Sequence, residues 1–242
     1  MRWIFSLLAL VLCAACSCGS KSRIVRIGVD PTWSPVNFGP MQPYVNGYID
    51  DLLLEIARYS GLKFEKVHAN ADTLLEGLRT GQYEAVLAAL PPYTFNEAKY
   101  DFSDHFLTLG PVLITAKGSS IQKLEKIPED NLVGVLQGDP AALFVQKQPG
   151  LILRYYSSTP ELLDAVSSGT VTAALLDRIK ACAYVSDLYQ TTLQVSSSPL
   201  NNEGLHFLQP KGKDASFFRL FEKSLKALEE KQDALQKKWK LA

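Results

Sequence analysis

Apolar and polar positions along the chain follow two periods, one typical of buried strands and one typical of helices. The clearest case is residues 162–177, LLDAVSSGTVTAALLD. This stretch predicts the end of a helix, a glycine stop at Gly169, a short apolar strand and an aspartate at the strand's tip. Residues 74–89, LLEGLRTGQYEAVLAA, repeat the same order of features, with Gly81 as the stop. We interpret the two stretches as copies of one βαβ-type unit.

The residues that flank the two copies also correspond, because a strand and a capped helix precede each copy. The pattern predicts strands over residues 24–29, 62–67, 84–90, 109–116, 132–136, 151–156, 171–177 and 204–209. It predicts helices over 47–60 with Gly61 as C-cap, after Asp72 and Thr159 as N-caps, over 179–189, and over 215–239. Single helices that alternate with strands favour an α/β fold with mostly parallel sheets. We therefore predict two similar lobes with a crevice between them.

Four polar or loop positions follow the carboxyl ends of predicted strands. They are Asp30, residues 89–92, residues 137–140 and Asp177. Ligands of open α/β sheets bind outside these strand ends, so we expect the four positions to converge on one cleft. Asp30 and Asp177 could form a catalytic carboxylate pair or anchor a cationic group, and each could also be a plain helix cap.

Composition limits the class of function. The chain has 242 residues, enough for one large domain or two smaller ones, and 47% apolar residues are sufficient for well-packed cores. Lys plus Arg and Asp plus Glu both number 25, and no long run of one sign occurs, which argues against nucleic-acid binding. The phosphate-binding glycine loop with lysine, GxSxG and HExxH are absent, and the three histidines lack metal-ligand spacing. We predict no catalytic residue, metal or cofactor.

The first residues carry a secretory pattern, predicted over residues 1–16. Arg2 precedes the apolar stretch 3–15, which is shorter than the ~20 residues of a spanning helix. The residues before Cys16 resemble the cleavage box of bacterial lipoproteins, although Cys13 stands where that box usually has leucine. We expect lipidation of Cys16 and a tether over 17–22. Lipidation of Cys18 and an ordinary cleaved signal are the alternatives.

One cysteine, Cys182, lies in the body of the chain, which excludes a disulfide framework. The expected location is the periplasm or the cell surface, with a lipid anchor as the only attachment to a membrane. No second apolar stretch approaches spanning length.

Several motifs in a fixed order resemble the periplasmic solute-binding proteins of ABC importers for polar amino acids. They are VRIGVDPTWSPVNF, the Gly47-Tyr48 pair before the Asp-Leu helix, LLEGLRTGQYEAVLAAL, YDFSDHF, VGVLQG, LLDAVSSGTVTAALLD and the closing KKW. The resemblance implies a type II binding-protein fold of two Rossmann-like lobes joined by two hinge segments. Lobe 1 would comprise residues 23–108 and 203–242, and lobe 2 residues 109–202. Ligand binding would close the lobes like a jaw.

The resemblance also implies a ligand site. Asp30 matches the residue that contacts the ligand's polar end, Trp33 the aromatic that covers it, Tyr48 a second apolar wall, and Asp177 the acid that takes its α-ammonium. The full set of predicted ligand-binding residues is Asp30, Trp33, Tyr48, Ala89, Leu90, Pro91, Asn96, Gly138, Asp139 and Asp177.

Two departures from the family pattern affect the ligand's α-carboxylate. Asn96 occupies the position of the family's arginine clamp, and Asp139-Pro140 replaces a pair of hydroxyl residues. Proline has no N–H to donate, and Asp139 adds negative charge. Either another cation, Lys99 or Arg178, substitutes for the clamp, or the ligand lacks a free carboxylate. We hypothesise a cationic or amine-bearing solute.

The predicted function is an extracytoplasmic receptor that delivers a polar or cationic amino acid, or a related amine-bearing solute, to an ABC permease in the inner membrane. We expect a monomer that is not an enzyme. One alternative is a secreted dehydratase-like enzyme on the same fold. The other is a surface interaction protein that has lost ligand binding.

Overall fold

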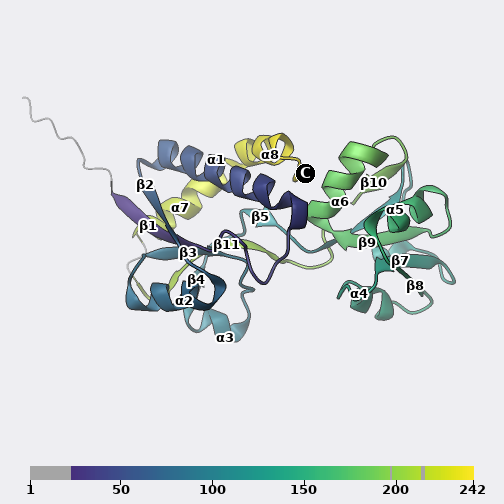
Figure 1. Ribbon diagram of the computed structural model, residues 1–242, viewed down its shortest axis with the longest axis horizontal. Helices are drawn as coiled ribbons and strands as arrows, with labels where there is room; N and C mark the ends of the chain where they lie inside the picture. The colour runs from purple at the N-terminus through teal and green to yellow at the C-terminus, as the bar shows by residue number, and fades with distance from the viewer. Residues whose placement is uncertain (1–22, 197, 214–215) are drawn as a thin grey trace, which may run out of the picture.

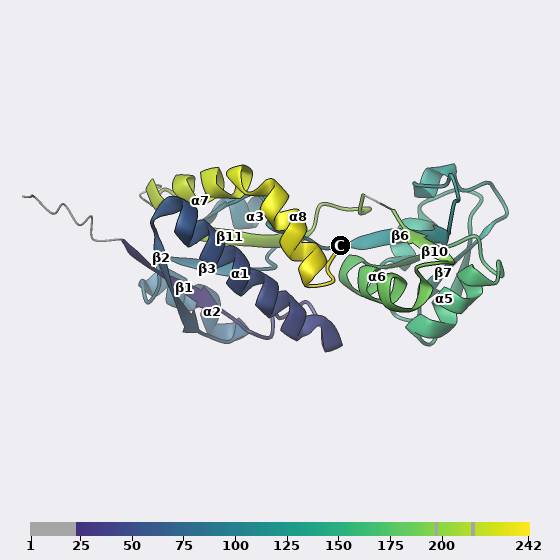
Figure 2. The same ribbon diagram turned by 90° about the horizontal axis from the view of Figure 1, so that it is seen from above.

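The computed structural model describes residues 23–196, 198–213 and 216–242. The strands form two separate sheets at opposite ends of an elongated molecule, with helices on both faces of each sheet (Figures 1 and 2). Two buried clusters lie in each lobe, one on each face of its sheet. The predicted α/β fold of two Rossmann-like lobes is confirmed.

The sheet of lobe 1 has the order β2-β1-β3-β11-β4, with β5 also paired to β11. Its strands are β1 (Ile24–Val29), β2 (Lys63–His68), β3 (Ala85–Ala88), β4 (Tyr100–Phe102), β5 (Leu107–Thr108) and β11 (Gly204–Pro210). Its helices are α1 (Gln42–Ser60), α2 (Ala71–Thr80), α3 (Thr94–Glu97), α7 (Ser216–Ala227) and α8 (Glu229–Lys238), with a 3-10 turn, Gly39–Met41, before α1. Strand β11 is antiparallel to its neighbours, whereas β1 runs parallel to β2 and β3.

The sheet of lobe 2 has the order β10-β6-β9-β7-β8. Its strands are β6 (Pro111–Ala116), β7 (Leu132–Leu136), β8 (Ile152–Tyr156), β9 (Ala173–Asp177) and β10 (Leu193–Val195). Its helices are α4 (Ala142–Gln146), α5 (Thr159–Ser167) and α6 (Arg178–Tyr184), which continues as a π-helical turn, Val185–Tyr189; a 3-10 turn, Leu124–Lys126, precedes β7.

The internal repeat of the sequence corresponds to a repeat of topology. Strands β2-β1-β3-β11 of lobe 1 match β8-β7-β9-β6 of lobe 2 in order and in direction. The repeated segment supplies α2 and β3 in one lobe and α5 and β9 in the other. Each sheet is mixed: β11 and β6, which continue the segments between the lobes, run antiparallel to the repeated strands, whereas the other strands of each sheet run in one direction, as the expectation of mostly parallel sheets implies.

Aromatic rings and glycines hold the layers of lobe 1 together. Phe207 on β11 has no exposed surface and stacks on Phe221 of α7, with ring centroids 4.1 Å apart. On the other face of the sheet the ring of Tyr83 occupies the space above Gly28, where an added Cβ would lie 2.5 Å from it. Tight aromatic packing therefore joins the layers on both faces of the lobe 1 sheet.

The helix ends correct several predictions. Helix α1 begins at Gln42 rather than at Gly47, since Pro43 is suited to a first helical turn. Asn70, not Asp72, caps α2 through a bond that its side chain accepts from the Thr73 N–H. Ser158, not Thr159, caps α5, and its hydroxyl accepts from the Glu161 N–H. The C-caps are confirmed, because Gly61 and Gly81 have φ of 73° and 77°.

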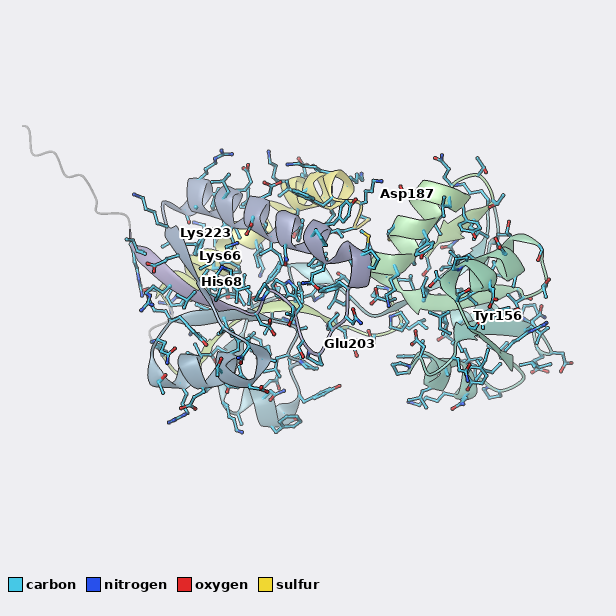
Figure 3. The ribbon with its side chains drawn as sticks, viewed as in Figure 1. Lys66, His68, Tyr156, Asp187, Glu203 and Lys223 are labelled. Atoms are coloured by element: carbon cyan, nitrogen blue, oxygen red, sulfur yellow. The ribbon has the colours of Figure 1, made fainter. Side chains whose placement is uncertain are left out.

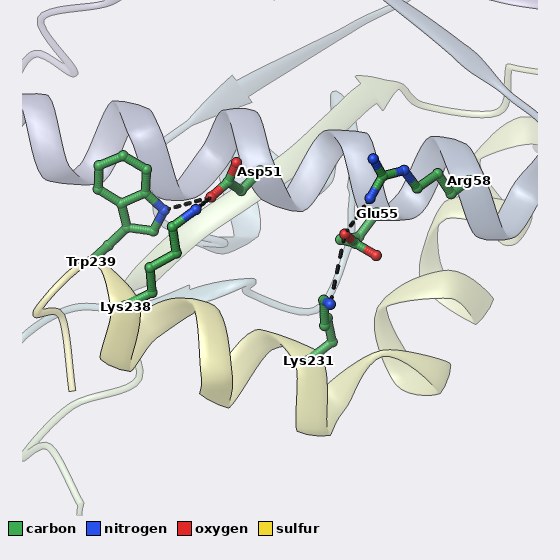
Figure 4. Close-up of polar contacts among 6 residues, drawn as sticks. All are labelled: Asp51, Glu55, Arg58, Lys231, Lys238 and Trp239. Atoms are coloured by element: carbon green, nitrogen blue, oxygen red, sulfur yellow. Dashed lines mark hydrogen bonds and ion pairs between the residues drawn. The ribbon is translucent and has the colours of Figure 1, made fainter.

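The carboxyl-terminal helix is fastened to α1 through Asp51 (Figure 4). The Asp51 carboxylate accepts from Lys238 at 2.7 Å and from Nε1 of Trp239 at 2.8 Å. The indole ring lies against Gly47, where an added Cβ would be 2.3 Å from the ring. Exposed ion pairs contribute little, about 0–1 kcal/mol, so the ring packing is the stronger restraint.

Two chain segments cross between the lobes, and they are hydrogen-bonded to each other. The Leu109 N–H donates to the Glu203 carbonyl and the Leu200 N–H donates to the Pro111 carbonyl, both at 2.8 Å. Gly110 has a φ of 84° in the first segment, a conformation that favours glycine. A third link is the ion pair between Lys240 of lobe 1 and Asp187 of lobe 2 at 2.8 Å.

The predicted signal, tether and lipidated Cys16 fall within residues 1–22 and lie outside the described residues. Within residues 23–196, 198–213 and 216–242, no helix combines the length and the apolar character required to cross a membrane. Across the same ranges no cluster of three or more His, Cys, Asp or Glu side chains could hold a metal ion.

Candidate functional site

A cavity of about 310 Å³ opens where lobe 2 meets the crossing segments. A volume of ~300–1,000 Å³ is typical of small-molecule sites. The residues that line the cavity come from the loop after β7, from helix α4, from the end of β9 and from both crossing segments. They are Gly110, Pro111, Asp139, Pro140, Ala141, Leu143, Phe144, Lys147, Asp177, Asn201 and Glu203. Glu203 lies between the two lobes, as Figure 3 shows.

Asp177 is positioned by the end of β9 and the start of α6. Its Oδ1 accepts from the N–H groups of Ile179 at 3.0 Å and Lys180 at 3.3 Å, so it caps α6. Burial raises the pKa of its carboxyl, and the charge of Asp139 acts in the same direction; Lys180 opposes the rise. No bond to Oδ2 occurs among the described residues, and this oxygen can receive a donor from a solute.

Asp139 follows a tight turn at the end of β7. Gly138 is exposed and has a φ of 78°, and this left-handed conformation turns the chain toward α4. The Oδ1 atom of Asp139 accepts from the Ala141 N–H at 2.8 Å. Pro140 supplies no N–H. The Asp139 carboxylate therefore already accepts from the Ala141 N–H, the donor that precedes α4.

Asp30 follows β1 and is 3% exposed. Its Oδ1 accepts from the N–H and the hydroxyl of Thr32 at 2.9 and 2.7 Å. Its Oδ2 is buried and has no hydrogen-bond partner among the described residues. A buried carboxylate oxygen without a partner is costly, which makes Oδ2 of Asp30 a candidate acceptor for a donor from a solute.

Trp33 and Tyr48, the predicted aromatic walls, belong to the core of lobe 1. Trp33 is 2% exposed and its Nε1 donates to Asn46 at 2.6 Å. Tyr48 has no exposed surface, and its hydroxyl donates to the Phe106 carbonyl at 2.6 Å. Neither ring lines the cavity, and their contact with a solute stays a prediction.

The loop after β3 has few donors. Ala89, Leu90 and Pro91 are half-buried, and none carries a polar side-chain atom. Asn96 is 7% exposed, and its Nδ2 donates to the Pro91 carbonyl at 2.8 Å. Its amide therefore holds the loop together instead of extending into the space between the lobes.

The structure brings together Asp139 and Asp177 among the predicted residues, and it leaves Asp30, Trp33, Tyr48, Ala89, Leu90, Pro91, Asn96 and Gly138 outside the lining of the cavity. Sequence reasoning did not single out Leu143, Phe144, Lys147, Asn201 or Glu203. Glu203 alone had a signal, since it directly precedes the strand that returns to lobe 1. Lys99 and Arg178, the suggested replacement cations, do not line the cavity.

The sequence and the fold both match known proteins. The profile of the bacterial extracellular solute-binding proteins, family 3, matches residues 25–242. The lysine/arginine/ornithine-binding periplasmic protein of Escherichia coli is 27% identical over 179 residues, which cover 73% of this chain and 69% of that protein. The arginine-binding extracellular protein ArtP of Bacillus subtilis is 24% identical over 98% of this chain and 97% of its own.

A solved structure has the same fold. It is the L-cystine solute receptor of Neisseria gonorrhoeae in its unliganded open conformation, with a TM-score of 0.71 and 18% identity. The alignment covers 90% of this chain and 93% of that one.

Proposed function

The chain belongs to the bacterial extracellular solute-binding proteins, family 3, and we propose that it captures a polar or cationic amino acid, or a related amine-bearing solute, between its lobes. It then delivers the solute to the permease of an ABC transporter. The observation that carries the proposal is the cavity at the lobe junction, where the half-buried Asp177 offers a free carboxylate oxygen. Relatives named for lysine, arginine and ornithine binding support a positively charged ligand.

Further parts of the proposal follow the family. We propose lobe limits of 23–108 with 203–242 and of 109–202, which agree with the membership of the two sheets. The protein acts as a monomer outside the cytoplasmic membrane and is attached to a membrane through lipidated Cys16. It performs no chemistry on the solute, since capture and closure are the complete mechanism.

Solute binding should close the lobes and stabilise the protein. At a ligand concentration of 100 times Kd, mass action adds about 2.7 kcal/mol to the free energy of unfolding. We expect a higher Tm together with a smaller radius of gyration in X-ray scattering, measured against a panel of polar amino acids and amines. A panel without any effect on Tm or radius would contradict the proposal and favour the surface interaction protein.

Affinity for an amine-bearing solute should fall as the pH decreases. Because burial raises the pKa of the Asp177 carboxyl, this group takes up a proton at a higher pH than an exposed aspartate. The amine binds the ionised form, so affinity decreases by about tenfold per pH unit below that pKa. Calorimetric titrations between about pH 7 and pH 4 measure the effect. The Asp177→Asn variant should lose this dependence, and a flat profile of the native protein would argue against an Asp177 anchor.

A further inference from the structure

The charges around the cavity are strongly unequal, and this inequality bears on what the proposed receptor binds. Three carboxylates line the cavity, those of Asp139, Asp177 and Glu203. Among the described lining residues the one cation is Lys147, which is exposed at the end of α4. Exposed charges are well hydrated and contribute only weakly to pairing, which applies to Lys147 and to Glu203 alike and leaves the half-buried carboxylates of Asp139 and Asp177. A ligand with a net positive charge is therefore favoured over a zwitterion.

The loop between β7 and α4 in lobe 2 offers no good position for a ligand carboxylate. Such a group is held in proteins by N–H donors, hydroxyls or a guanidinium. The N–H before α4 that could donate, that of Ala141, is already bonded to Asp139 at 2.8 Å. Pro140 has no N–H, and the carboxylate of Asp139 would repel a second anion at this position.

Lobe 1 is equally poor in donors on the loop after β3. Residues 88–90 are Ala, Ala and Leu, and Pro91 and Pro92 have no N–H. The buried amide of Asn96 donates to the Pro91 carbonyl at 2.8 Å and is not directed at a ligand. A carboxylate bound here would lose its hydration without gaining equivalent bonds, which is a severe penalty for a charged group.

An independent observation comes from the far side of the junction. Oδ2 of Asp30 is buried and has no partner among the described residues, although Asp30 lies at the carboxyl end of β1, where solutes approach this type of sheet. Each lobe thus has an acid whose second oxygen has no partner among the described residues, Asp177 in the lining of the cavity and Asp30 buried outside it. Leu143 and Phe144 line the same cavity as Asp177 and supply apolar surface for a hydrocarbon chain.

We propose that the ligand is an organic cation without an α-carboxylate, with an amine or guanidine at each end of a short hydrocarbon chain. One cationic end binds Asp177, and the other lies near the carboxylates of Glu203 and Asp139. This inference rests on the proposed function, because it names the class of solute for the same site. Such a ligand differs from a cationic amino acid only in the missing α-carboxylate, and that difference makes the inference testable.

The test uses pairs of compounds that differ only in the α-carboxylate: arginine and agmatine, ornithine and putrescine, lysine and cadaverine. Calorimetry on the full protein should give a Kd at least about tenfold lower for the decarboxylated member of the best pair, because a desolvated carboxylate is left unpaired. If the amino acid binds as tightly or more tightly, the inference fails and the proposed function stands. If no member of any pair binds, the inference fails, and the wider panel of polar amino acids and amines decides on the proposed function.

A double variant tests the cause of the preference. Asp139→Thr with Pro140→Thr removes the carboxylate and restores a hydroxyl and an N–H before α4, at one half-buried and one exposed position. The preference for the decarboxylated compound should shrink several-fold. Asp130→Asn, an exposed substitution elsewhere in lobe 2, is the matched control and should leave the ratio unchanged. An unaltered ratio in a folded double variant would overturn the assignment.

Discussion

Replacing Asp177 by Asn should reduce affinity for a cationic solute by at least about thirtyfold. Loss of one partner from a buried, hydrogen-bonded charge pair costs about 2–5 kcal/mol, and 1.4 kcal/mol corresponds to a factor of ten. Asn keeps an oxygen that can accept from the Ile179 and Lys180 N–H groups, which Asp177 now caps at 3.0 and 3.3 Å. Helix α6 should therefore form normally, and the loss will report on charge alone. Calorimetric titration at neutral pH measures it.

A matched control separates this effect from a change in total charge. Asp130 is exposed in the same lobe and has a φ of 62°, a conformation that asparagine tolerates. Asp130→Asn should leave affinity within about twofold of the native value, since an exposed charge contributes little at a distance. Equal affinities of the Asp177→Asn variant and the native protein would show that Asp177 is a helix cap only.

Replacing Phe207 by Ala should lower the free energy of unfolding by about 3–5 kcal/mol, the range for removal of a buried phenylalanine ring. The side chain has no exposed surface. It stacks on Phe221 at 4.1 Å between centroids and meets Phe217 and Phe218 at 5.9 and 6.1 Å. Because α7 contacts the sheet through these rings, a movement of one side chain cannot fill the space that the missing Phe207 ring would leave.

Urea denaturation measures the Phe207 effect, and the exposed ring of Phe95 provides the comparison. Phe95 is 64% exposed, so Phe95→Ala should change the free energy of unfolding by less than about 0.5 kcal/mol. A saturating ligand should recover part of the stability lost in Phe207→Ala, because binding stabilises the native state by mass action. A loss below about 1 kcal/mol would mean that lobe 1 repacks around the missing ring.

The order of helices and strands was predictable because it depends on local patterns. Gly81 and Gly169 have positive φ and end the helices that the sequence places before them. The repeated segments became α2 with β3 and α5 with β9, and each strand lies at the same place in its sheet. The N-caps were harder, since Asn70 and Ser158 stand one or two residues from the predicted caps and have equally suitable side chains.

The candidate site was only partly predictable. Asp139 and Asp177 line the cavity as expected of residues at strand ends. Residue type alone did not reveal that the Asn96 amide turns inward to Pro91, or that Tyr48 is enclosed by the core. Both facts depend on where neighbouring helices pack, which no local pattern records.

The sequence by itself determined the family, the two-lobe α/β fold, the repeat and the acid at the tip of β9, because hydrophobic period, glycine stops and motif order are properties of short segments. The tertiary structure alone decided which side chains share a cavity. Glu203 lines the same cavity as Asp177 because two crossing segments, distant in sequence, pair with each other, and Lys240 forms an ion pair with Asp187 across the lobes for a similar reason. Contacts of this kind arise from packing between elements far apart in the chain, and that packing sets the charge that a ligand encounters.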